Sequence, residues 1–215
     1  MYNFTPIDWC EPNYVYSKYI AEFWNTISNI TFLILGYYGF KYCKKNILNS
    51  TYYLIFTIYI LIGIFSAYFH ASLTTLGQLL DEISIYFVIV TGLCCYMDIN
   101  MLITLPFIPV IFIYPYYNPY LLFILGIGIF YKVNVSFTKM NDTQKRLVAI
   151  IIVMFLISLF LWLFDKVCYF DGEIHTHFIF HITIAMTGFL AIIFLDYVKN
   201  DRKNHNTLRE VFDIV

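Results

Sequence analysis

The sequence predicts an all-α membrane protein in which seven transmembrane helices surround an intramembrane metal site. Hydrophobic residues make up 60% of the 215 residues and charged residues only 13%, a composition typical of polytopic membrane proteins. Long apolar runs follow one another with short polar segments between them. Histidines and a carboxylate stand at the ends of such runs, where their burial is costly and therefore indicates a function.

We interpret residues 1–215 as a single domain, since the chain has no internal repeat. It divides into an extramembrane N-terminal segment (1–22), a seven-helix bundle (23–197) and a basic tail (198–215). The formal net charge of −1 gives no indication of nucleic-acid binding.

Apolar runs long enough to cross a bilayer, about 20 residues each, define the spans. The stretch from Met101 to Tyr131 is long for one span and short for two, and Pro115 and Pro119 indicate a turn within it. We divide this stretch in two, because His70 and His177 reach the same side of the membrane only if an even number of spans separates them. The predicted spans are Phe23 to Phe40, Tyr52 to Phe69, Glu82 to Met97, two within 101–131, Leu147 to Phe164 and His177 to Tyr197.

Lysine and arginine residues are distributed unevenly between the two sides of the predicted membrane. The positive-inside rule places the C-terminal tail in the cytosol and the N-terminus and histidines on the lumenal or external side. We expect an endomembrane location, in the endoplasmic reticulum or the Golgi. The side assigned to the cytosol carries Lys41, Lys44, Lys45, Lys132, Lys139, Lys145, Arg146, Lys199, Arg202, Lys203 and Arg209, and the other carries Lys18 and Lys166.

This orientation bears on glycosylation and on disulfide formation. Sequons at Asn49, Asn134 and Asn141 fall on the cytosolic side, where they cannot be glycosylated, and we give the charge distribution more weight than these sequons. Cys10 and Cys168 both fall on the oxidising side, where they could pair as a disulfide.

The N-terminal segment gathers acidic and amide side chains shortly before the first span. Their oxygens, with backbone carbonyls between them, could supply the six to eight oxygen ligands of Ca²⁺, although EF-hand spacing is absent. The alternative is a solvated cap with a helix that begins near Ser17. The candidate ligands are Asp8, Glu11, Asn13 and Glu22.

A pair of histidines four residues apart, together with a third histidine, indicates a zinc site. Ser66 and His70 are four residues apart, as are His177 and His181, so each pair shares one face of a helix. Three imidazoles with a water in the fourth position form a typical catalytic zinc site. The alternative for any single histidine is a side chain that bridges two helices.

Asp81 is the nearest carboxylate in sequence to His70, and we expect a short loop between the two. It could take a proton from a zinc-bound water and return it to a leaving group. Ser66 could donate to a developing oxyanion, or could instead bond the carbonyl one turn back.

Other polar side chains have less specific roles. Asn25, Ser28 and Asn29 in the first span could bond neighbouring helices or orient the groups of the metal site. His175 cannot share a helical face with both His177 and His181, so we expect it to be a surface neighbour of the site.

The motifs DWCEPNY, YIAEFWNTISN, SAYFHASL with GQLLDE, and the final HFIFH together resemble the alkaline ceramidase family. These are seven-span amidases of a larger group that includes the adiponectin receptors, and the resemblance runs along the whole chain. It implies hydrolysis of the ceramide amide to a sphingoid base and a free fatty acid.

The same resemblance implies roles for individual residues. It assigns catalytic roles to Ser66 and Asp81, and a disulfide to Cys10 and Cys168. It adds the carbonyl of Trp9 to the calcium ligands. The implied zinc ligands are His70, His177 and His181, and the implied calcium ligands are Asp8, Trp9, Glu11, Asn13 and Glu22.

Two other functions are weighed against ceramide hydrolysis. A receptor of the adiponectin or progestin type would hold a structural or weakly hydrolytic zinc, but would be expected to have a longer cytosolic head in place of the acidic N-terminal cluster. A small channel or transporter would carry more ionisable groups midway along its spans. We expect ceramide and membrane lipid as the partners, with Zn²⁺ and Ca²⁺ as cofactors, no nucleic acid and no obligate protein partner.

Overall fold

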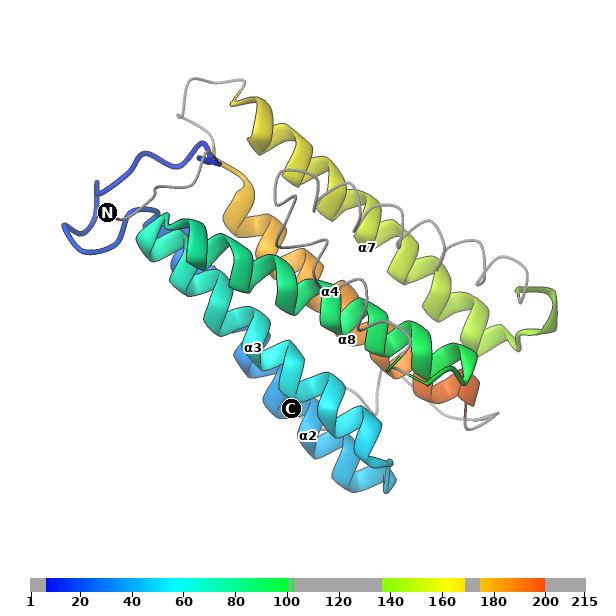
Figure 1. Cartoon of the computed structure of the whole chain (residues 1–215). Helices are drawn as coiled ribbons and strands as arrows, with labels where there is room; N and C mark the ends of the chain where they lie inside the picture. Colours follow the sequence, from blue (N-terminus) through cyan, green and yellow to red (C-terminus); the bar gives the residue numbers. More distant parts are fainter. Residues whose placement is uncertain (1–6, 101, 103–136, 169–174, 200–215) are drawn as a thin grey trace.

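The computed structural model describes residues 7–100, 102, 137–168 and 175–199, and within them every long element is an α-helix (Figure 1). Four of the described helices are long and apolar enough to cross a membrane, namely α3, α4, α7 and α8. The predicted spans within 101–131 lie outside the described residues, apart from residue 102. The elements are α1 (Phe23–Ser28), α2 (Ile30–Asn46), α3 (Ser50–Ser72), α4 (Thr75–Met97), η3 (Phe137–Lys139), α7 (Asp142–Val167) and α8 (His177–Lys199).

The first predicted span begins at Phe23 as expected, but it continues to Asn46 and is interrupted at Asn29. The backbone of Asn29 stays in the right-handed helical region (φ −65°, ψ −14°), so the chain keeps its direction. At this point side chains bond to a backbone carbonyl of the helix. The Asn29 amide and the Ser28 hydroxyl both donate to the Asn25 carbonyl, at 2.8 and 2.9 Å. Such local bonds compete with the helical ladder.

Small residues let α2 and α3 approach closely, as is common between membrane helices. A Cβ added at Gly39 would lie 2.1 Å from the ring of Phe56, and one added at Gly36 would lie 2.3 Å from Ile60. The same interface belongs to a buried apolar core to which α7 and α8 also contribute.

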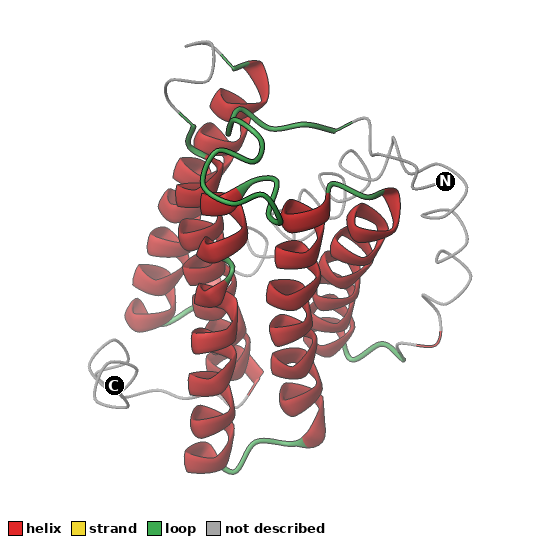
Figure 2. Ribbon diagram, turned by 90° about the vertical axis from the view of Figure 1, so that its left-hand side faces the viewer, coloured by secondary structure: helices red, strands yellow, loops and turns green. Residues whose placement is uncertain are grey.

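The helix ends and the N-terminal segment that carry the predicted site residues gather at one end of the bundle (Figures 1 and 2). At this end α3 and α7 finish, α1, α4 and α8 begin, and the N-terminal segment folds over them. The described basic residues at Lys41, Lys44 and Lys45 lie instead at the other end of α2. The ends of α4 and α8 meet at that other end through an Asp98–Lys199 ion pair.

Two of the sequons act as helix caps. The side chain of Asn49 accepts the Thr51 N–H at the start of α3, and that of Asn141 accepts the Gln144 N–H at the start of α7. Asparagine is among the preferred N-cap residues. Helix capping therefore explains why asparagine stands at these two positions, and glycosylation is not needed to explain the two N-x-S/T patterns.

A methyl group at Gly39 should destabilise the bundle. Gly39→Ala would force the buried Phe56 ring to move, and overpacking of this kind costs about 1–3 kcal/mol. We expect a lower melting temperature of the detergent-purified protein. Gly92→Ala is the matched control, because its Cβ would meet no described atom within 4 Å; an equal loss in both variants would contradict the close α2–α3 contact.

Candidate metal centre

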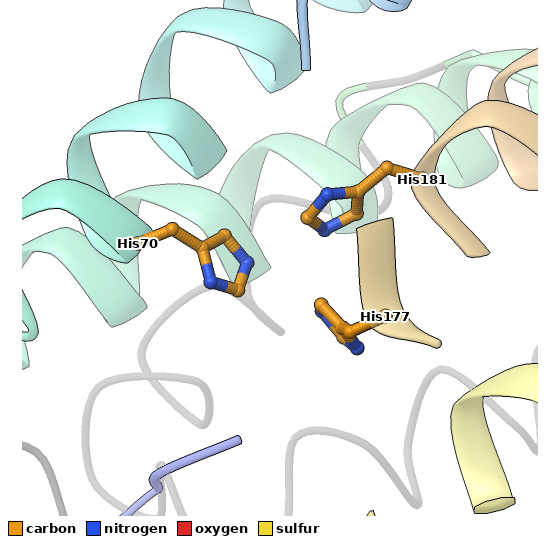
Figure 3. Close-up of side chains that lie close together, drawn as sticks. All are labelled: His70, His177 and His181. Carbon is orange, nitrogen blue, oxygen red and sulfur yellow. The ribbon is translucent and has the colours of Figure 1, made fainter. Parts of the chain in front are cut away.

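Three buried imidazoles meet where α3 ends and α8 begins (Figure 3). His70 lies in the last turn of α3, and His177 and His181 lie one turn apart on α8. One nitrogen from each ring lies within 4.8 Å of the others, and the side chains are only 1%, 3% and 3% exposed. Among the described residues this is the one group of three or more His, Cys, Asp or Glu side chains that is arranged to hold a metal ion.

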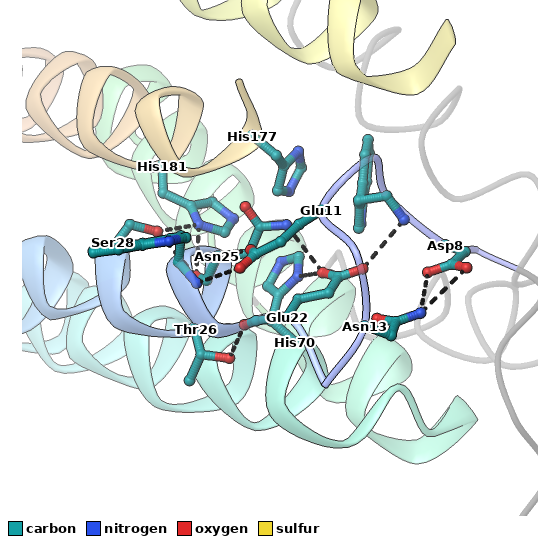
Figure 4. Close-up of polar contacts among 12 residues, drawn as sticks. Asp8, Glu11, Asn13, Glu22, Asn25, Thr26, Ser28, His70, His177 and His181 are labelled. Atoms are coloured by element: carbon teal, nitrogen blue, oxygen red, sulfur yellow. Dashed lines mark hydrogen bonds and ion pairs between the residues drawn. The ribbon is translucent and has the colours of Figure 1, made fainter. Parts of the chain in front are cut away.

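Glu22 holds His70 through both its side chain and its backbone. Its Oε2 lies 2.5 Å from Nδ1 of His70, and its N–H donates to the His70 carbonyl at 3.0 Å (Figure 4). A metal-binding histidine commonly donates its other ring N–H to a carboxylate in this way. The contact leaves Nε2 of His70 as the nitrogen available to a metal.

His181 is oriented by α1. Its Nδ1 lies 3.1 Å from the Asn25 carbonyl and 2.8 Å from the Ser28 hydroxyl. Because a carbonyl oxygen only accepts, Nδ1 carries the hydrogen and Nε2 is left with its lone pair. The polar residues of the first span thus include two that orient the histidine cluster, one of the two roles considered from the sequence.

His177 is held differently from the other two. Its Nδ1 is buried and has no hydrogen-bond partner among the described residues. Its ring stacks on the indole of Trp9, with centroids 3.7 Å apart and planes inclined by 25°. Its backbone N–H donates to Oδ1 of Asp165 at 3.1 Å.

Asp165 was missed in the sequence analysis, which treated it as the first residue of a loop. It lies instead in the last turn of α7, is fully buried and accepts three backbone N–H groups. The available signal was a single acidic residue at the end of an apolar run, three residues before Cys168.

Ser66 and Asp81 lie near each other at the end of α3 and the start of α4. The Ser66 side chain is buried one turn before His70, and it interacts with the Asp81 carboxylate. The second oxygen of Asp81, Oδ1, is buried without a hydrogen-bond partner among the described residues. A carboxylate with a free oxygen, close to a serine that lies one turn from His70, is suited to accept a proton from a reacting group.

The expected loop between His70 and Asp81 is only two residues long. Leu73 takes a left-handed conformation (φ 46°) after α3, and Thr74 caps α4 by accepting the Gly77 N–H at 3.1 Å. Asp81 therefore lies inside α4, whereas we had predicted that the third span begins just after it. Thr74 caps the first turn of α4, and Gly77 lies within that turn.

The predicted calcium ligands lie in one folded segment, but hydrogen bonds already occupy the carboxylate oxygens among them (Figure 4). Both oxygens of Glu11 cap α1, accepting from the N–H groups of Trp24 at 2.7 Å and Asn25 at 2.8 Å. The amide of Asn13 donates to Asp8 at 3.1 Å. No helix begins near Ser17, because residues 7–22 fold without helix, so the alternative of a simple cap with an early helix is wrong.

Burial makes this segment favourable for a cation. It raises the pKa of Glu11 above its usual range and that of Glu22 to about 7, because a low-dielectric environment disfavours the charged form. A cation nearby would offset this penalty.

A disulfide joins Cys10 to Cys168, with Cα atoms 5.2 Å apart and a sequence separation of 158. The pairing predicted from the sequence is confirmed. It ties the N-terminal segment to the end of α7, next to Asp165. His175 stays outside the histidine cluster, as expected, and its ring contacts Phe178.

Comparison with known proteins gives this site a context. The family model for ceramidases matches residues 2–213. This chain belongs to the alkaline ceramidase family. It is 35% identical over 212 residues to alkaline ceramidase 1 of Mus musculus, covering 86% of this chain and 77% of that protein.

Two further alkaline ceramidases are similar to this chain, one over most of its length and one over part of it. Alkaline ceramidase 1 of Homo sapiens is 33% identical over 213 residues, covering 86% of this chain and 80% of that protein. An alkaline ceramidase of Drosophila melanogaster is 42% identical over 86 residues, covering 39% of this chain and 30% of that protein. The relation to adiponectin receptors stays a prediction.

Removing the disulfide should loosen the N-terminal segment. We expect Cys10→Ser with Cys168→Ser to lower the free energy of unfolding by about 2–5 kcal/mol, because the unfolded chain regains the freedom of a long closed loop. Thermal unfolding in detergent measures the change. Cys95→Ser, which removes a free and half-buried thiol, is the control, and an unchanged melting temperature in the double variant would contradict this role.

Proposed function

We propose that this alkaline ceramidase family member hydrolyses the amide bond of ceramides to a sphingoid base and a free fatty acid, with a zinc ion held by His70, His177 and His181. The observation that carries the proposal is the histidine cluster, with Ser66 one helical turn before His70 and in interaction with Asp81. Family membership supports an amidohydrolase that acts on a linear amide. The names of the relatives supply the substrate class.

The histidine cluster fits a zinc ion on three counts. Three neutral imidazoles are the protein ligands of one common catalytic zinc site. Two of the rings have Nδ1 engaged by acceptors, so that Nε2 is free to bind. The buried Glu22 carboxylate next to His70 would balance part of the charge of the ion.

The proposed chemistry divides the work between the metal and two side chains. Zinc, when bound, lowers the pKa of a coordinated water to about 7 and polarises the substrate carbonyl. Asp81 accepts one proton from the attacking water as its oxygen bonds to the amide carbon. Asp81 then returns this proton to the nitrogen as the C–N bond breaks, which releases the amine and leaves the carboxylic acid.

Ser66 serves two purposes in this scheme. In the resting protein its hydroxyl interacts with Asp81 and helps to orient that carboxylate. During the reaction it would donate to the oxygen that develops negative charge, one helical turn from His70. A purely structural zinc would need neither Ser66 nor Asp81, so this pair favours hydrolysis over the receptor alternative.

Calcium is proposed to hold the N-terminal segment over the histidines. Asp8, Glu11, Asn13 and Glu22 would supply oxygens together with the Trp9 carbonyl, with some of their present hydrogen bonds exchanged for the ion. The support is the burial of the Glu11 and Glu22 carboxylates, at 1% and 0% exposure.

The membrane setting follows from the four apolar helices. We propose that the seven-span topology holds, that the C-terminal tail is cytosolic and that the protein resides in an endomembrane. The histidine end then faces the lumen, where the Cys10–Cys168 disulfide is stable.

Two substitutions should separate metal binding from proton transfer. We expect His70→Ala to lose both zinc and the release of sphingoid base from a ceramide panel measured by mass spectrometry. Asp81→Asn should keep zinc but lose activity by roughly 10²–10⁴-fold, because only the proton acceptor is removed. His175→Ala, a histidine outside the cluster, is the control; full activity in Asp81→Asn would exclude the proposed mechanism.

Calcium should raise the melting temperature of the wild-type protein. A ligand at 100 times its Kd stabilises the folded state by about 2.7 kcal/mol. Asp8→Ala should abolish this increase, whereas Asp98→Asn should keep it, because Asp98 lies at the opposite end of the bundle in an ion pair with Lys199. A calcium-induced increase that is equal in Asp8→Ala would place the ion elsewhere.

A further inference from the structure

The Asp165 carboxylate joins three parts of the chain at the candidate metal centre. It is fully buried at the end of α7. Oδ1 accepts the N–H groups of Thr176 at 2.5 Å and His177 at 3.1 Å, and Oδ2 accepts that of Cys10 at 3.2 Å. One side chain thus fixes both the beginning of α8 and the N-terminal segment.

His177 needs such an anchor more than the other two histidines do. His70 is oriented through Nδ1 by Glu22, and His181 through Nδ1 by Asn25 and Ser28. The Nδ1 atom of His177 has no partner among the described residues. What orients this ring is therefore its backbone position and the surface against which it lies.

Asp165 fixes both the backbone position of His177 and the Trp9 surface against which its ring lies. Its bond to the His177 N–H fixes the first turn of α8, from which the imidazole projects. Its bond to the Cys10 N–H fixes the residue next to Trp9, whose indole stacks on the His177 ring at 3.7 Å. A carboxylate at a helix start is also favourable in itself, because the first N–H groups of a helix lack partners within the helix.

We propose that Asp165 is the positioning residue for His177, acting through the backbone and through Trp9 in place of a hydrogen bond to the imidazole. The inference rests on the proposed zinc site. The other interpretation is that Asp165 only stabilises the fold. The two differ in what happens to the metal site of a folded variant.

The test is Asp165→Asn, which keeps the shape of the side chain but replaces one acceptor oxygen with an amide that repels an N–H. We expect zinc affinity, measured by competition with a chromophoric chelator, to fall roughly 10–100-fold, as when other partners that orient metal ligands are changed. The visible spectrum of the Co²⁺-loaded variant should depart from wild type and resemble that of His177→Ala. Ser158→Ala is the matched control, because it removes a buried α7–α8 hydrogen bond to Thr183 instead.

Each outcome has a distinct meaning. Wild-type affinity and a wild-type Co²⁺ spectrum in Asp165→Asn would overturn the positioning role, as would an equal loss in Ser158→Ala. Zinc binding by wild type that is unaffected by His70→Ala would instead overturn the zinc site itself. Should Asp165→Asn fail to fold, Thr176→Pro removes one N–H donated to Asp165, at the residue just before α8 begins, together with the hydroxyl bond to the Leu161 carbonyl. A smaller loss of affinity with the same spectral change is expected, and no change would contradict the proposal.

Discussion

Three buried carboxylates that accept backbone N–H groups determine how this end of the bundle is built. Glu11 caps α1, Asp165 caps α8, and Glu22 accepts the Trp9 N–H while holding His70. Helix starts leave N–H groups without partners, and where these groups are buried, other protein groups must accept them. Because each carboxylate comes from a segment distant in sequence from at least one of its partners, satisfying these donors also fixes the N-terminal segment, α1, α7 and α8 relative to one another.

This arrangement gives the three imidazoles unequal support. His70 and His181 have hydrogen-bond partners at Nδ1, whereas His177 depends on its backbone and on the Trp9 ring. The N-terminal segment contributes to both kinds of support, through Glu22 and through Trp9, and the Cys10–Cys168 disulfide keeps it in place. Any ion bound among Glu11, Glu22 and their neighbours would therefore act on the same contacts that orient the histidines. The short N-terminal segment is thereby a structural part of the histidine cluster.

Several features could be predicted from the sequence because they depend on local spacing. The pairs Ser66 with His70 and His177 with His181 follow from helical periodicity, and the cysteine pair was found through the resemblance and the expected sidedness. Asp165 and the capping role of Glu11 could not be found in this way, since each acts on donors more than ten residues away. The start of α4 was placed too late because a threonine cap followed by glycine looks like a loop when the neighbouring α3 is unknown. The break at Asn29 likewise depends on which side chains reach the Asn25 carbonyl.

By itself, the sequence determined that this is an α-helical membrane protein with apolar spans, which residues could bind metals, and which family it resembles, because composition and periodicity are properties of the chain alone. Only the tertiary structure decided that nitrogens of three histidines from two helices come within 4.8 Å of one another. It also decided that Nδ1 of His70 and of His181 is hydrogen-bonded, so that Nε2 of each ring is left available to a metal. It also decided that a carboxylate at the end of α7 anchors the first turn of α8. The physical reason is that buried polar groups must find partners, and which partners they find depends on how distant segments pack.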